Sequence, residues 1–145
     1  SLVFRPTESD PDPASIPAPD AEGIYTITIN TNTMTYNIAA PLYMLGDGCA
    51  AGWDNTAALP MFTAGNGVYF LNTALGAGLS IKFITTLGAW EPMYGYATGT
   101  PEAGTLVYRA PGAADVPNLT TPAAAGNYVV TADITNLTYT VAAGK

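Results

Sequence analysis

Residues 126–141 read GNYVVTADITNLTYTV, and this stretch decides the fold. Apolar and polar residues alternate from Tyr128 to Thr131 and again from Leu137 to Val141, with a polar turn between the two runs. Alternation with a period of two is typical of a β-strand that is buried on one face. The stretch therefore predicts a β-hairpin.

The same alternation recurs along the chain, and no segment carries a convincing helical period. Short strands at this spacing, separated by clusters of Gly, Pro and Asn, are typical of sandwich folds. We therefore predict an all-β, immunoglobulin-like antiparallel β-sandwich. The predicted strands lie near residues 24–29, 34–38, 42–45, 68–71, 79–84, 105–108, 128–131 and 137–141.

An internal repeat links the two ends of the chain. The stretch GIYTITINTNTMTYNI, starting at Gly23, aligns without gaps with the stretch starting at Gly126, at an offset of 103 residues. SLVFR, starting at Ser1, resembles TLVYR, starting at Thr105, at an offset of 104 residues. A period of about 100 residues is the size of a whole β-sandwich. The alternative is that hairpins of similar composition resemble one another by chance.

The repeat sets the predicted domain limits. Residues 1–21 are predicted to be a Pro-rich lead-in, the tail of a preceding repeat or its equivalent, which is mobile or packed along the surface. Residues 22–145 are predicted to form one sandwich domain that is entered through the shared hairpin.

The composition excludes several classes of protein. The net charge of −7 would repel the phosphates of a nucleic acid, so we expect no nucleic-acid partner. No apolar run reaches the roughly 18 residues of a transmembrane segment, and the start of the chain does not resemble a signal peptide. The single cysteine, Cys49, excludes an internal disulfide, and the Thr-, Asn-, Gly- and Ala-rich composition resembles that of exported bacterial proteins.

The catalytic inventory is small, because the chain has no histidine to serve a nucleophile or a zinc ion. A glycosidase needs two carboxylates that face a cleft, and that route stays open through residues such as Asp54 and Glu91. Asp47 and Asp54 also suggest a calcium site, but no EF-hand spacing is present and turn chemistry explains them better. No metal or organic cofactor is indicated.

Both tryptophans of the chain lie in predicted connections, Trp53 in GWDN and Trp90 in GAWEP. Lys82 lies between them in LSIKFI, the only lysine before the C-terminal one. Flat rings receive the apolar face of a sugar ring, and a cation donates hydrogen bonds to its hydroxyl groups. Two alternatives remain: tryptophans that plug the core, and a lysine that keeps an edge strand solvated.

The segments LYMLGDGCAAGWDNTAALPM, LSIKFI, GAWEPMYG and GNYVVTADITNLTYTV resemble the repeated domains of the SusE and SusF type outer-membrane starch-binding lipoproteins of Bacteroidetes starch-utilisation systems. The resemblance covers about residue 22 to the end of the chain. It implies a non-catalytic carbohydrate-binding domain that holds starch or a related α-glucan at the cell surface. It also implies a lipid anchor in the outer membrane for the full-length precursor, and as partners the neighbouring repeats and a surface complex for glycan uptake.

The resemblance also implies a set of site residues. Trp53 and Trp90 match the family's aromatic platform, and Lys82 matches the lysine that bonds sugar hydroxyls. Asn118 in VPNLT falls near the position of the family's asparagine, and Tyr96 is placed beside the platform, whereas Tyr94 is expected to pack in the interior. The alternative function is a structural spacer or assembly domain, in which the tryptophans would be buried or point apart.

Overall fold

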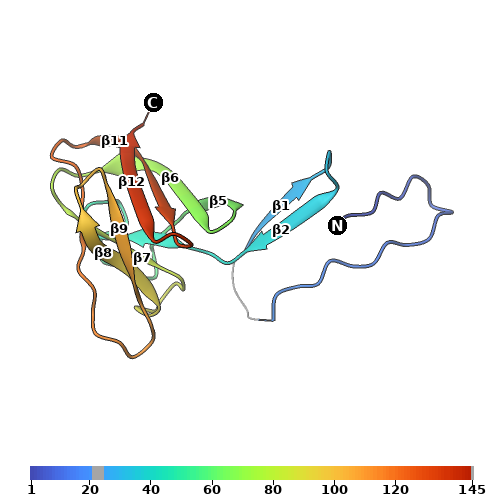
Figure 1. Cartoon of the computed structure of the whole chain (residues 1–145), viewed down its shortest axis with the longest axis horizontal. Helices are drawn as coiled ribbons and strands as arrows, with labels where there is room; N and C mark the ends of the chain where they lie inside the picture. Colours follow the sequence, from blue (N-terminus) through green and yellow to red (C-terminus); the bar gives the residue numbers. More distant parts are fainter. Residues whose placement is uncertain (21–24, 145) are drawn as a thin grey trace.

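The computed structural model describes residues 1–20 and 25–144, and it is an all-β antiparallel sandwich, as predicted (Figure 1). Across these residues the structure has strands and connections but no helix. The strands are β1 (Thr26–Asn30), β2 (Thr35–Ala39), β3 (Tyr43–Leu45), β4 (Leu59–Pro60), β5 (Phe62–Gly65), β6 (Val68–Leu75), β7 (Ser80–Ile84), β8 (Met93–Gly99), β9 (Ala103–Arg109), β10 (Leu119–Thr120), β11 (Gly126–Asp133) and β12 (Thr138–Ala143).

The sandwich is one continuous sheet folded into two layers. The strand order is β4-β3-β7-β8-β9-β12-β11-β6-β5, and β10 pairs with β7 outside this path. The layers are joined where Ala103–Thr105 of β9 pair with Thr138–Thr140 of β12. The result is a nearly closed arrangement rather than two separate sheets, with β7, β8 and β9 on one side and β12, β11 and β6 on the other (Figure 1).

The main core lies between these two layers. Strand β12 shows how the sequence fills it, because Tyr139 and Val141 are buried while their neighbours along the strand are exposed. Phe83 of β7 and Leu106 of β9 meet them from the opposite layer in the same hydrophobic cluster. Burial of the alternate apolar positions on both layers is the main stabilising contribution expected for such a fold.

Strand β8 was absent from the sequence prediction, because its segment MYGYATG carries two glycines and lacks a strand-like run. The structure shows why one of them is needed. A Cβ atom on Gly95 would overlap the Pro117 carbonyl oxygen and the Val116 side chain. Gly95 thus lets the connection after β9 lie directly against β8, where the Tyr96 amide donates to the Pro117 carbonyl over 2.8 Å. The short strands β4, β5 and β10 were also not predicted.

The β1–β2 hairpin is a two-stranded sheet separate from the sandwich (Figure 1). It approaches the sandwich at β5, and the Tyr69 hydroxyl donates to the Ala40 carbonyl just after β2. The predicted domain limits, residues 22 and 145, lie outside the described residues, so they stay predictions.

Candidate functional site

The loop between β3 and β4, with the sequence GDGCAAGWDN, is a turn structure anchored to the neighbouring strand β7. The Gly46 amide donates to the Gly52 carbonyl over 2.7 Å and closes the turn. Gly46 has a φ of 132°, and a Cβ atom there would overlap the backbone of Ser80 and Ile81. The Asp47 carboxylate accepts from the Ser80 amide over 2.9 Å. The glycines and Asp47 therefore hold the loop against β7.

Trp53 lies at the end of this loop, and Trp90 lies in the connection between β7 and β8. The two connections are bonded to each other, because the Gly88 amide donates to the Asn55 carbonyl over 3.0 Å. Asp54 stabilises the turn after Trp53 by accepting from the amide and the hydroxyl of Thr56. Trp53 is 40% exposed and Trp90 is 43% exposed. Neither tryptophan is a core plug.

Lys82 is buried, with 5% of its surface exposed, although it lies on the outer face of β7. The neighbouring loops cover this face, and a second hydrophobic cluster forms there around Ile84 and Met93. Strand β7 pairs with β3 and β8, so it is not an edge strand. The alternative of a solvated edge-strand lysine is therefore wrong. The Lys82 Nζ atom lies 2.8 Å from the Asp115 carboxylate.

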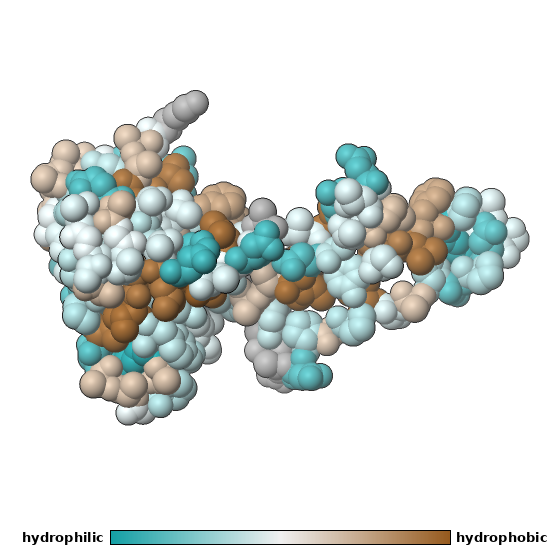
Figure 2. Space-filling model, in the orientation of Figure 1, coloured by the Kyte–Doolittle hydropathy of each residue, from teal (hydrophilic) through white to brown (hydrophobic). Residues whose placement is uncertain are grey.

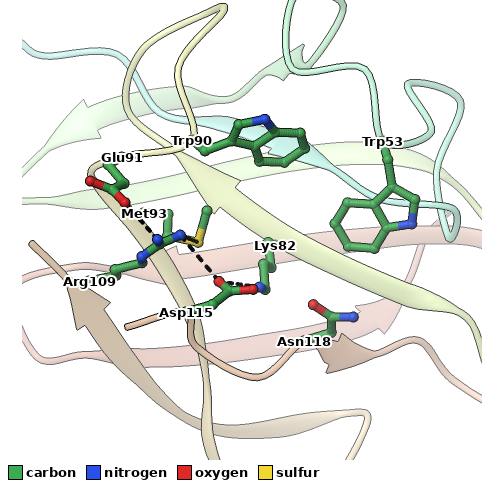
Figure 3. A pocket seen from close by; sticks show the side chains of 8 residues that line it. All are labelled: Trp53, Lys82, Trp90, Glu91, Met93, Arg109, Asp115 and Asn118. Carbon is green, nitrogen blue, oxygen red and sulfur yellow. Dashed lines mark hydrogen bonds and ion pairs between the residues drawn. The ribbon is translucent and has the colours of Figure 1, made fainter. Parts of the chain in front are cut away.

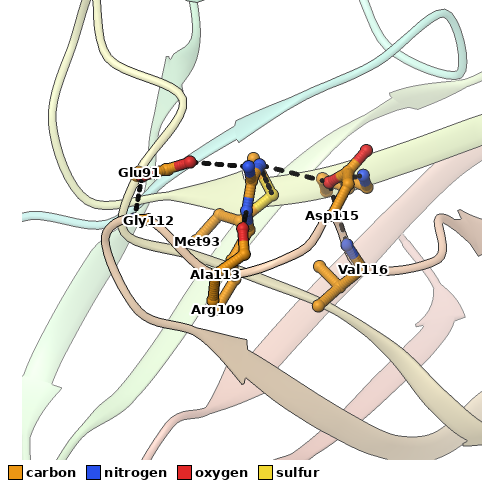
Figure 4. A network of polar contacts seen from close by, with 8 residues as sticks. Glu91, Met93, Arg109, Gly112, Ala113, Asp115 and Val116 are labelled. Atoms are coloured by element: carbon orange, nitrogen blue, oxygen red, sulfur yellow. Dashed lines mark hydrogen bonds and ion pairs between the residues drawn. The ribbon is translucent and has the colours of Figure 1, made fainter.

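Arg109 organises the carboxylates beside Lys82 (Figure 4). Its guanidinium lies 2.6 Å from Glu91 and 3.3 Å from Asp115, and its Nε atom donates to the Ala113 carbonyl. The second oxygen of Glu91 accepts from the Gly112 amide. These contacts tie the end of β9 and the loop after it to the connection that carries Trp90.

These side chains line one pocket of about 630 Å³. Figure 3 shows the two indole rings along one side of it and the polar groups opposite them. Three of its lining side chains are apolar, four are charged and one is an amide, a combination suited to a ligand with both apolar and polar surfaces. Its lining residues are Trp53, Lys82, Trp90, Glu91, Met93, Arg109, Asp115 and Asn118.

Four of the five residues predicted for the site thus come together in this pocket: Trp53, Trp90, Lys82 and Asn118. The fifth, Tyr96, does not line it. Tyr96 lies in a smaller neighbouring pocket of about 250 Å³, which also borders Asn118, and its hydroxyl donates to the Gly99 carbonyl.

Tyr94 is half-buried and packs against the main core, as the sequence suggested, with its ring 5.2 Å from the ring of Tyr108.

Sequence reasoning missed four lining residues, namely Glu91, Met93, Arg109 and Asp115. Glu91 is adjacent to Trp90, but the sequence pattern indicated it only as a possible carboxylate of a glycosidase. Arg109 carried a usable signal, since it is one of four basic residues in the chain. Asp115 carried none, because its place beside Lys82 depends on how the loop after β9 crosses β8.

No group of three or more His, Cys, Asp or Glu side chains suited to a metal ion occurs among residues 1–20 and 25–144. Asp47 and Asp54 are used in turn hydrogen bonds. Cys49 packs against the core, and burial raises the pKa of its thiol. A thiol with a raised pKa is a poor nucleophile at neutral pH.

The hydrogen bond from Lys82, aided by the charge of Arg109, lowers the pKa of Asp115 below its usual value. As the pH falls, Asp115 is therefore protonated at a higher pH in the unfolded chain than in the folded protein. The charged Asp115 carboxylate stabilises the fold above about pH 4, and this stabilisation is lost at lower pH. We expect wild type to be more stable than Asp115→Asn at neutral pH, with the difference shrinking below about pH 4. Thermal unfolding of both proteins between pH 2 and 7 measures this, and a difference that is constant with pH would contradict it.

No helix long and apolar enough to cross a membrane occurs in the described part of the chain. Comparisons of the chain with protein-family models, with curated proteins and with solved structures found no match.

Proposed function

We propose that the protein is a non-catalytic carbohydrate-binding domain whose site is the pocket between Trp53 and Trp90. One observation carries the proposal: two half-exposed indoles lie together above Lys82, Asp115 and Asn118 (Figure 3). Exposure of an apolar aromatic ring to water is unfavourable, and a ligand that covers the ring removes this cost. Two such rings beside buried and charged hydrogen-bonding groups favour a ligand that is apolar on its faces and polar at its edges.

A sugar ring has this chemistry. Its C–H face packs on an indole, and its hydroxyl groups at the edge both donate and accept hydrogen bonds. The Lys82 ammonium has three donors, of which one meets Asp115, and Asp115 keeps 66% of its side chain exposed. The ion pair therefore presents a donor and an acceptor side by side, which matches a vicinal pair of hydroxyl groups.

The preferred ligand in this proposal is starch or a related α-glucan. The support is the resemblance of GDGCAAGWDN, LSIKFI and GAWEP to SusE and SusF type starch-binding domains, together with the convergence of the corresponding side chains in one pocket. The smaller pocket borders Asn118, so a glucan chain that leaves the main pocket on that side reaches Tyr96. The proposal includes the location of the protein at the outer membrane surface, held by a lipid anchor in the full-length precursor.

A glycosidase is a weaker proposal. Its general acid needs a carboxyl group with a raised pKa. In this pocket Lys82 and Arg109 lower the pKa of Asp115. Glu91 is held by Arg109 and by the Gly112 amide. Both carboxylates are thus placed as fixed hydrogen-bond acceptors.

Affinity electrophoresis tests the proposal. The native chain is run through gels that contain amylopectin, a β-glucan or no glycan. We expect retardation by amylopectin only, with a dissociation constant for a malto-oligosaccharide between about 10 μM and 1 mM. The free energy gained by covering two partly exposed rings only modestly exceeds the entropic cost of ordering a flexible ligand. Unchanged mobility of the folded protein in all three gels would refute the proposed ligand class.

Replacement of Lys82 by methionine separates binding from stability. Methionine fills the volume of the buried lysine stem. The other partner of the ion pair, Asp115, is exposed and remains paired with Arg109. We therefore expect the free energy of unfolding to change by less than about 1 kcal/mol. Loss of the charged donor is expected to weaken malto-oligosaccharide binding at least about tenfold. Calorimetric titration and thermal unfolding measure the two effects.

Arg5→Met is the matched control, since it removes the same charge outside the pocket. Equal loss of affinity in Lys82→Met and Arg5→Met would show that net charge, not the Lys82 ammonium, controls binding.

A further inference from the structure

The β1–β2 hairpin repeats the β11–β12 hairpin in backbone geometry as well as in sequence. Met34 has a φ of 52° and Leu137, 103 positions later, has a φ of 53°. Positive φ values are uncommon for such residues. In both hairpins the side-chain oxygen that opens the turn, from Asn30 or from Asp133, accepts from the amides two and three residues later. The two turns therefore have the same structure, which chance similarity of composition does not require.

The N-terminal segment repeats β9 in the same way. The Leu2 amide donates to the Met34 carbonyl over 2.7 Å, and the Leu106 amide donates to the Leu137 carbonyl over 2.8 Å. Leu2 thus makes the same contact with the β1–β2 turn that Leu106 of β9 makes with the β11–β12 turn.

The arginine that ends each of these segments also makes equivalent contacts. Arg5 pairs with Asp12, seven residues later, and its Nε atom donates to the Asp10 carbonyl. Arg109 pairs with Asp115, six residues later, and its Nε atom donates to the Ala113 carbonyl.

The two hairpins differ in what covers their apolar face. In β11 and β12 the apolar positions of one face are 0 to 5% exposed and belong to the main core. The equivalent positions of β1 and β2 lie on one face as well, because Ile27 is opposite Ile38 and Ile29 is opposite Tyr36. Ile27 is 60% exposed and Ile29 is 55% exposed. Figure 2 shows hydrophobic residues at the surface in this part of the molecule.

We propose that this face is the docking surface for a second β-sandwich unit, equivalent to residues 40–104 and preceding Ser1 in a longer protein, and that residues 1–39 are its closing strands. A complete copy of the present sandwich does not fit the face, because its own β11–β12 hairpin already fills the corresponding place. The occupant is therefore a unit that lacks these strands. It would receive Ile27, Ile29, Tyr36 and Ile38 where the present core receives Val130, Ala132, Tyr139 and Val141.

The completed unit would also receive the equivalents of three residues that line the present pocket. The Arg5–Asp12 pair occupies the place of Arg109 and Asp115, which line the first pocket. Ser15 occupies the place of Asn118 at the offset of 103 residues. The preceding unit would thus receive the same ion pair and, in place of the asparagine, a shorter polar side chain.

The test adds a second copy of residues 40–104 directly before Ser1, which recreates the junction before Thr105. Ile27→Cys is introduced into this extended chain and into the 145-residue chain, with Cys49→Ser in every copy. We expect thiol labelling at position 27 to be at least about 100-fold slower in the extended chain, because a core position reacts only after unfolding. Thr33→Cys, at the exposed turn, is the control that reacts equally fast in both chains.

Equal labelling at position 27 in both chains would overturn the proposal. Sedimentation velocity of the 145-residue chain supplies a second, independent test. We expect a monomer whose mass and stability are unchanged by Ile27→Lys. A dimer that Ile27→Lys dissociates would show that a second copy of the chain, not a preceding unit, covers this face.

Discussion

Trp90→Ala and Trp53→Ala are each expected to weaken malto-oligosaccharide binding between about 10-fold and roughly 60-fold. A sugar ring covers on the order of 100 Å² of apolar surface on one indole, which corresponds to about 2.5 kcal/mol as an upper figure. Each ring is about two-fifths exposed, so its removal leaves the core intact. The double variant is expected to lose measurable binding. Calorimetric titration with maltoheptaose provides the measurement.

Phe70→Ala is the control for these variants. Phe70 lies on β6 in the opposite layer and is 43% exposed, the same fraction as Trp90, but it does not line the pocket. We expect the affinity of the Phe70→Ala variant for maltoheptaose to equal that of wild type. Wild-type affinity in both tryptophan variants, with the fold retained, would place the binding surface outside this pocket.

Gly46→Ala is expected to lower the free energy of unfolding by about 3 kcal/mol or more. The new Cβ atom would overlap the Ser80 carbonyl oxygen, and the φ of 132° is strained for any residue with a side chain. Because Gly46 holds the loop of Trp53 against β7, the same change is expected to abolish glycan binding. Urea unfolding and titration with maltoheptaose measure the two effects.

Gly52→Ala is the matched comparison in the same loop. Gly52 has a φ of 56°, but a Cβ atom there meets nothing within 4 Å. We expect a loss of only about 1 to 2 kcal/mol, the usual cost of a left-handed conformation for alanine. If both variants lost the same stability, contact with β7 would not be what makes Gly46 necessary.

The sequence was sufficient for the parts of the fold that local patterns determine. Alternation in GNYVVTADITNLTYTV predicted the β11–β12 hairpin, and glycines around Trp53 predicted that this ring lies on a turn. The position of Lys82 between the two tryptophans in the sequence singled it out, the resemblance added Asn118, and the structure places both beside the two tryptophans.

The rest of the site depends on contacts between distant segments. Strand β8 was not predicted, because Gly95 reflects the close approach of the later connection at Val116 and not a local preference. The burial of Lys82 follows from the loops that cover the outer face of β7, and its pairing with Asp115 joins positions 33 residues apart. No local pattern in a single sequence reports such a contact.

The most direct test of the central claim uses the two tryptophans as reporters. The chain has only these two, and both line the pocket, so a proton–nitrogen correlation spectrum of the labelled protein contains two indole N–H signals from the site. We predict that both signals shift on titration with maltoheptaose, with one shared dissociation constant, and that cellohexaose leaves them in place. Two signals that do not move with maltoheptaose, in a protein whose backbone spectrum is that of a folded β-sandwich, would contradict the account.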